Sequence, residues 1–121
     1  MGNILIVDDS SLIRSVASEA TIEAGHTPIV AENGEVGLAK LQENYIDLIF
    51  SDVNMPIMGG LEMVEKIKAQ EEYKFVPIIM LTTESNPELK EKGKALGVKG
   101  WLLKPFNREK FFTAVKKLIR T

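Results

Sequence analysis

Three acidic residues directly follow short apolar runs of the sequence: Asp8 and Asp9 follow Ile4–Val7, and Asp52 follows residues 47–51. Two unit charges 4 Å apart repel each other by about 1 kcal/mol in water and by several times more near a protein surface. Three gathered carboxylates would therefore raise one another's pKa values or bind a cation. Oxygen ligands without His or Cys select a hard ion, and a site open to water favours Mg²⁺ over Ca²⁺.

Two further apolar runs end on a hydroxyl and a cation: Thr82 follows residues 76–81, and Lys104 follows residues 98–103. A metal-bound aspartate that faces a lysine suits phosphoryl transfer, because catalysis of that reaction is mostly positioning and charge neutralisation. Asp52 could act as the nucleophile, as carboxylates do when they form aspartyl phosphates. Lys104 and Thr82 would then each hold a phosphoryl oxygen.

Each of these residues also has a simpler interpretation on its own. Asp8 or Asp9 could cap a following helix, since Asp is a common N-cap. Asp52 could be a turn residue, and Lys104 could be a solvated side chain before a strand-ending turn. These alternatives stay open for each residue taken alone. The shared position of the residues at the ends of different apolar runs favours a common site.

The apolar runs alternate with helical patterns along the chain, and this alternation indicates how the side chains are positioned. The predicted strands are Ile4–Val7, Thr27–Ala31, Ile46–Ser51, Val76–Leu81 and Val98–Leu103. The predicted helices span residues 11–24, 34–43, 60–71, 87–96 and 108–119. Such alternation predicts an α/β domain whose parallel sheet carries helices on both faces. In such sheets, binding sites lie beyond the carboxyl ends of the strands.

Helix and turn patterns make three local predictions. Leu12 belongs to the apolar face of the helix 11–24 and should be buried. The helix 87–96 is the weakest, because Gly93 inside it costs about 1 kcal/mol relative to Ala. His26 follows a glycine in a predicted turn, where a lone histidine is expected to be solvated.

The composition is that of one ordinary globular domain. The chain has 121 residues, of which 45% are apolar and 26% charged, near the averages for such domains. The absence of cysteine excludes disulfides, thiolate metal sites and cysteine nucleophiles. The net charge of −2 argues against direct nucleic-acid binding. No apolar run approaches the roughly 20 residues of a membrane span. The N-terminus lacks the basic lead of a signal peptide, so we expect a cytoplasmic protein.

Four segments carry a resemblance to a known family: Ile4–Ser10, Ser51–Pro56 with Gly59 and Gly60, Met80–Glu84, and Gly100–Phe106. In these segments the chain resembles the receiver domains of bacterial two-component response regulators, and most of all their stand-alone chemotaxis members. The segments follow in the family's order over the whole chain. The resemblance implies a single flavodoxin-like, doubly wound (βα)5 domain over residues 1–121. Its parallel sheet would have the strand order 2-1-3-4-5, and no output domain is expected.

The resemblance also implies roles for the candidate residues. Asp52 would be the phosphoacceptor, and Lys104 would pair with the phosphoryl group. Asp9 and Asp52 would bind Mg²⁺ directly, Asp8 would act chiefly through water, and Asn54 would add its backbone carbonyl.

Further positions are implied in switching and in the lifetime of the phosphoryl group. Thr82 would move to bond a phosphoryl oxygen and vacate space into which an aromatic side chain turns. That aromatic is Tyr or Phe in most members of the family and is Trp101 here. Side chains at Asn54 and Glu84 would tune the lifetime. The Lys104–Pro105 peptide bond is expected to be cis.

The resemblance implies a signalling switch rather than an enzyme. A histidine kinase would supply the phosphoryl group, and the chain would catalyse only its own phosphorylation and autodephosphorylation. Because no output domain is expected, the output would be a contact with a protein target, for which the flagellar motor switch protein is the family expectation. A single-domain phosphorelay intermediate is the main alternative. A dedicated phosphatase is a further candidate partner, and we expect a monomer.

Two other classes of protein use related features. Aspartate-based phosphatases of the haloacid dehalogenase type share a strand-end nucleophilic Asp and Mg²⁺. They usually place a general-acid Asp two residues later, where this chain has Asn54, which cannot donate a proton in that way. A flavodoxin-like FMN module has a similar topology, but it requires a Ser-, Thr- or Gly-rich phosphate loop where Asp8 and Asp9 stand. Both classes are therefore disfavoured.

Overall fold

The computed structural model describes residues 2–83 and 87–119. The strands are β1 (Asn3–Val7), β2 (Thr27–Ala31), β3 (Leu48–Asp52), β4 (Ile78–Thr82) and β5 (Gly100–Leu103). The helices are α1 (Ser11–Glu23), α2 (Gly34–Glu43), α3 (Gly60–Lys68), α4 (Pro87–Leu96) and α5 (Arg108–Leu118). All strand pairs are parallel, in the order β2-β1-β3-β4-β5. The predicted α/β fold and strand order are confirmed.

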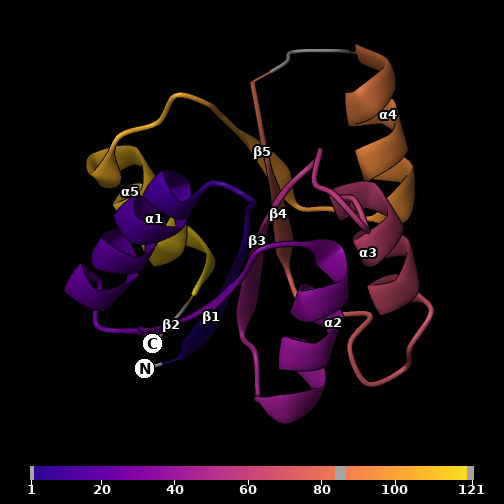
Figure 1. Ribbon diagram of the computed structural model, residues 1–121, viewed down its shortest axis with the longest axis horizontal. Helices are drawn as coiled ribbons and strands as arrows, with labels where there is room; N and C mark the ends of the chain where they lie inside the picture. The colour runs from indigo at the N-terminus through magenta and orange to yellow at the C-terminus, as the bar shows by residue number, and fades with distance from the viewer. Residues whose placement is uncertain (1, 84–86, 120–121) are drawn as a thin grey trace.

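The sheet lies between two layers of helices. Figure 1 shows α1 and α5 on one face and α2, α3 and α4 on the other. Alternate residues of each strand enter two separate cores: Ile4 and Ile6 of β1 face α1 and α5, and Leu5 and Val7 face the other layer. Every residue of β3 and β4 is buried. This burial explains why the central strands are near-continuous apolar runs, as is usual for parallel sheets covered on both faces.

Three strands, β3, β4 and β5, begin two residues later than predicted. The apolar residues before them, Ile46, Val76 and Val98, pack against the core without joining the sheet. The N–H groups of Val76 and Val98 donate to the carbonyls of Tyr73 and Gly93, at 3.0 Å each. Hydrophobicity reports burial, and burial alone does not distinguish a strand from the loop that enters it. These three predicted strands are therefore too long at their N-terminal ends.

Polar side chains begin three of the helices. Ser10, Asn33 and Asn107 cap α1, α2 and α5 by accepting a hydrogen bond from the N–H three residues later, which satisfies one of the free donors of a helix start. The predicted bounds of α2 and α4 agree with the structure. Within the two described ranges, none of the helices has the length and apolar character that a bilayer span requires.

Two side chains lie in surroundings opposite to those predicted. Leu12 is 71% exposed, because the face of α1 that meets the sheet carries Ala17 and Ala20 and Leu12 lies beside that face. His26 is only 7% exposed. Its Nδ1 accepts a hydrogen bond from the N–H of Gly2 at 2.9 Å. The predictions of a buried Leu12 and a solvated His26 are therefore wrong.

Candidate functional site

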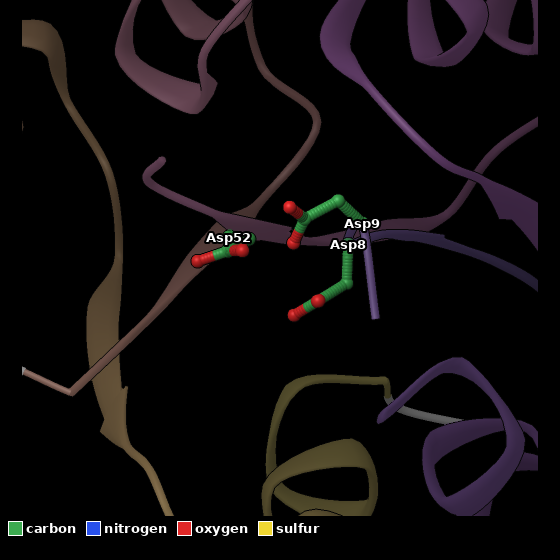
Figure 2. Close-up of side chains that lie close together, drawn as sticks. All are labelled: Asp8, Asp9 and Asp52. Atoms are coloured by element: carbon green, nitrogen blue, oxygen red, sulfur yellow. The ribbon is translucent and has the colours of Figure 1, made fainter. Parts of the chain in front are cut away.

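Three carboxylates meet at the carboxyl end of the sheet. Asp8 and Asp9 directly follow β1, and Asp52 is the last residue of the neighbouring strand β3. One carboxylate oxygen from each residue lies within 4.8 Å of the others, and Figure 2 shows the three side chains together at the strand ends. Because β1 and β3 are adjacent and parallel, acids from distant parts of the chain reach one place.

Lys104 places its ammonium between two of these acids. Nζ lies 2.8 Å from Oδ2 of Asp8 and 3.2 Å from Oδ1 of Asp52. The lysine side chain is only 13% exposed, so the interpretation of Lys104 as a solvated residue is wrong. Its backbone N–H donates to the carbonyl of Thr82 at 2.7 Å, which holds the residue beside the end of β4. The Lys104–Pro105 peptide bond is cis.

The capping alternative for the first two acids does not hold. Ser10 is the N-cap of α1, and its Oγ accepts from the N–H of Ile13 at 3.3 Å. Asp8 is fully buried, and its Oδ1 accepts a hydrogen bond from the N–H of Ser10 at 2.9 Å. Asp9 is exposed. Asp8 and Asp9 both precede the N-cap residue, so neither caps α1 and both carboxylates belong to the acid cluster.

Asp52 belongs to the strand and not to a turn. Its Oδ1 accepts from the N–H of Val53 at 2.9 Å, and its carbonyl accepts from Oγ of Ser51 at 2.9 Å. The residue is 8% exposed. Asp52 is therefore held by its own neighbours in the chain, with one carboxylate oxygen within 4.8 Å of oxygens of Asp8 and Asp9.

Arg14 and Gly60 lie against the backbone of Asp8 and Asp52, and neither is among the predicted site residues. Nη1 of Arg14 donates to the carbonyl of Asp8 at 2.7 Å. Gly60 is the first residue of α3, and a Cβ at this position would overlap the carbonyl oxygen of Asp52. A glycine at the start of a predicted helix is the only sequence signal for this close approach, and no sequence signal marks Arg14.

Burial and neighbouring charges shift the pKa values of Asp52 and Lys104. Burial, together with the charge of Asp8, raises the pKa of Asp52 above its usual value, against the opposing effect of Lys104. Burial alone would lower the pKa of Lys104, but its hydrogen bonds and the charges of Asp8 and Asp52 outweigh burial and raise that pKa. The lysine is therefore held as a cation. Carboxylates gathered this closely favour the binding of a further cation.

The donor set fits a hard divalent ion. The available ligands are carboxylate oxygens, which suit Mg²⁺ and Ca²⁺ rather than softer metals. Oδ2 of Asp8 is buried, and Nζ of Lys104 lies 2.8 Å away. Asp9 is exposed, and this opening to water suits Mg²⁺, which usually keeps several waters.

The other predicted site residues lie around this cluster. Thr82 is the last residue of β4 and is 5% exposed. Trp101 of β5 is half-buried and pairs in register with Met80, two residues before Thr82. Because side chains alternate along a strand, Thr82 and Trp101 share the face covered by α3 and α4. Asn54 is exposed in the loop after β3, and Glu84 lies outside the described residues.

Known proteins share both the sequence and the fold. The response regulator receiver domain family matches residues 4–116. The chemotaxis protein CheY homolog of Campylobacter jejuni is 36% identical over 105 residues, which are 85% of this chain and 81% of the homolog. The probable transcriptional regulator ycf29 of Porphyra purpurea is 31% identical over 117 residues, which are 97% of this chain. The chain spans only 56% of the length of that regulator.

A solved structure agrees closely with the fold. The chemotaxis protein CheY4 of Vibrio cholerae superposes with a TM-score of 0.93 and 46% identity, over 98% of this chain and 99% of CheY4. Receiver domains are signalling switches that typically bind Mg²⁺ and interact with histidine kinases. From the strand order, the acid cluster and these matches together, the chain belongs to the response regulator receiver domain family and is CheY-like.

Proposed function

We propose that this chain is a phosphorylation-activated switch, with Asp52 as the phosphoacceptor and the phosphohistidine of a histidine kinase as the donor. The observation that carries the proposal is the position of Lys104, whose ammonium lies 2.8 Å from Asp8 and 3.2 Å from Asp52. A fixed cation beside a carboxylate reduces the repulsion that an incoming phosphoryl group would otherwise meet. The chemotaxis proteins among the relatives support this function.

The transfer is a substitution at phosphorus. A carboxylate oxygen of Asp52 forms a bond to phosphorus as the bond from phosphorus to the donor imidazole nitrogen breaks, and the bonding electron pair stays with the imidazole. Lys104 and the Thr82 hydroxyl hold oxygens of the transferred group. Asp8, Asp9, Asp52 and the Asn54 carbonyl would hold Mg²⁺, which when bound supplies positive charge against the phosphoryl oxygens. Attack by water on phosphorus later restores the Asp52 carboxylate and releases phosphate.

The signal leaves the site through a change of conformation. Asp52 is 8% exposed, so a target protein has little direct access to its carboxylate. A phosphoryl group shifts an equilibrium only by interacting differently with its two states. We infer that Thr82 and Trp101 provide that difference. Their movement would change the conformation of the surface that extends from α4 to α5. The flagellar motor switch protein is the expected target, and a cytoplasmic location follows from these partners.

Labelling by a small phosphoryl donor tests the acceptor. With acetyl phosphate and Mg²⁺, the wild-type chain should incorporate up to one phosphoryl group, and Asp52→Asn should incorporate almost none, because an amide is not a competent nucleophile. Mass spectrometry of the intact protein measures both. Asp47→Asn is the matched control, since Asp47 lies before β3 and accepts a hydrogen bond from the N–H of Asn3 that an amide oxygen can also accept. Stoichiometric labelling of Asp52→Asn would refute the assignment.

A phosphorelay intermediate remains the alternative role, and a binding measurement separates it from motor control. A peptide from a flagellar motor switch protein should bind at least several-fold more tightly in the presence of Mg²⁺ and BeF₃⁻, which mimics the phosphoryl group. Transfer of the phosphoryl group from labelled chain to a second histidine protein, without such a gain in peptide affinity, would favour the phosphorelay.

A further inference from the structure

The indole of Trp101 lies directly against the backbone of α4 at Gly93. A Cβ built on Gly93 would lie 2.5 Å from Cζ2 and 3.3 Å from Cε2 of the indole. Carbon atoms in ordinary contact are about 3.5–4.0 Å apart. The ring therefore occupies space that the side chain of any other amino acid at position 93 would need.

This contact lies at the buried position of α4. Gly93 is the one buried residue of α4, all of which lies within the described part of the chain. Leu89 and Leu96 are only partly buried against the core. Glycine in a helix interior is less favourable than alanine. A helix with so little buried surface therefore carries an unfavourable residue at the place where a large ring meets it.

We propose that Gly93 is a positioning residue for Trp101: without a side chain at position 93, the indole can lie beneath α4, and the ring and the helix then change position together. The inference rests on the switch role proposed above for Trp101. An indole is larger than the ring of Tyr or Phe, and the missing Cβ at Gly93 supplies the space that the larger ring needs. If the ring turns away, α4 loses this contact at Gly93 and can move.

The coupling of the two residues can be measured in a double-mutant cycle of urea unfolding. Gly93→Ala should lower the urea midpoint in the wild-type background, because its Cβ collides with the ring. In a Trp101→Leu background the same change should lower the midpoint much less, because only Cγ2 of Val98, 3.1 Å from the added Cβ, must still shift and alanine favours a helix. Ala95→Gly is the matched control at an exposed site of α4 and should lower the midpoint similarly in both backgrounds.

Fluorescence distinguishes positioning of the ring from a general loss of stability. Trp101 is the only tryptophan of the chain, so its emission can be assigned without ambiguity. Gly93→Ala should shift the emission to longer wavelength and increase quenching by acrylamide, under conditions where the variant is fully folded. The emission change on adding Mg²⁺ and BeF₃⁻ should fall to less than half of the wild-type change, because the ring is already displaced.

The outcomes separate this inference from the proposed function. An equal effect of Gly93→Ala in both backgrounds, or an unshifted emission spectrum, would overturn the positioning role even if Asp52 is phosphorylated. A failure of Asp52 to accept a phosphoryl group would refute the proposed function but leave the difference between the two backgrounds in urea intact, because that cycle uses neither Mg²⁺ nor a phosphoryl donor.

Discussion

At the scale of single residues, the site is a set of charges that are unfavourable on their own. Asp8 is fully buried and lies beside the carboxylate of Asp52, and Lys104 is the cation that both contact. The raised pKa of Asp52, which burial and Asp8 cause, means that its negative charge lowers the stability of the metal-free protein. The function that we propose for Asp52 and the stability of the protein therefore make opposite demands on this residue.

Neutralising Asp52 should stabilise the metal-free protein. Asp52→Asn removes the repulsion from Asp8 and keeps an oxygen that can accept from Val53, so we expect the free energy of unfolding to rise by up to about 1 kcal/mol. Urea unfolding in EDTA measures it. Saturating Mg²⁺ should stabilise the wild type more than the variant, since the variant has lost a ligand. A variant less stable than the wild type in EDTA would contradict this account of the charges.

At the scale of elements, the junction between β3 and α3 sets the position of Asp52. Gly60 begins α3 against the backbone of Asp52, and its N–H donates to the carbonyl of Val53 at 2.8 Å. In the connecting loop, Ile57 has a φ of 70°, which is unusual for a β-branched residue. The loop between β3 and α3 therefore turns sharply, and the first residue of α3 lies against the end of β3.

Enlarging Gly60 should damage both stability and phosphorylation. Gly60→Ala places a Cβ against the Asp52 carbonyl, and overpacking of this kind costs about 1–3 kcal/mol. We expect a lower urea midpoint and slower labelling by acetyl phosphate, because the strand end that carries the proposed acceptor must shift. Gly59→Ala is the control, since its Cβ would lie 3.1 Å from the carbonyl of Val53 and requires a smaller shift. Equal effects of the two changes would contradict the proposed role of Gly60.

At the scale of the whole molecule, hydrogen bonds hold the start of β1 at the end of the sheet opposite the acids. Nδ1 of His26 accepts from the N–H of Gly2, and the N–H of Thr27 donates to the carbonyl of Gly2 at 2.9 Å. Oδ2 of Asp47 accepts from the N–H of Asn3 at 2.8 Å. These bonds join the starts of β1, β2 and β3, and only a neutral imidazole can accept the first of them.

Stability should fall as His26 becomes protonated. Burial lowers the pKa of His26 below its ordinary value of 6.5, the positive charges of the amino terminus and Lys116 add to that lowering, and Asp47 opposes it. The unfolded chain therefore binds the proton first. The contribution of neutral His26 to the free energy of unfolding is complete above pH 6.5. It is lost as the pH falls toward the folded-state pKa, and the free energy of unfolding then falls by at most about 1.4 kcal/mol per pH unit.

The matched variant for this pH dependence is His26→Asn, whose amide oxygen can accept the same hydrogen bond and does not titrate. Urea unfolding at several pH values between pH 7.5 and 5 should show a steeper loss of stability for the wild type than for His26→Asn. Parallel curves for the two proteins would exclude His26 as the cause.

The sequence by itself determined the alternation of strands and helices and the acids at the ends of β1 and β3. These features depend on hydrophobic period and residue type, which are properties of a few neighbouring residues. The same local signals failed where burial depends on distant neighbours. Leu12 is exposed and His26 is buried because the packing of α1 on the sheet, and of Gly2 beside the start of β2, is not encoded in their immediate surroundings.

Only the tertiary structure decided the contacts that give the site its chemistry. The approach of Lys104 to Asp8 and Asp52, the close fit of Gly60 on the Asp52 carbonyl, and the indole of Trp101 against Gly93 all join residues far apart in the chain or in different elements. A residue type and its spacing indicate what a side chain can do. Whether two such side chains meet depends on the register of the strands and on the packing of helices against them, because these set distances to within an ångström.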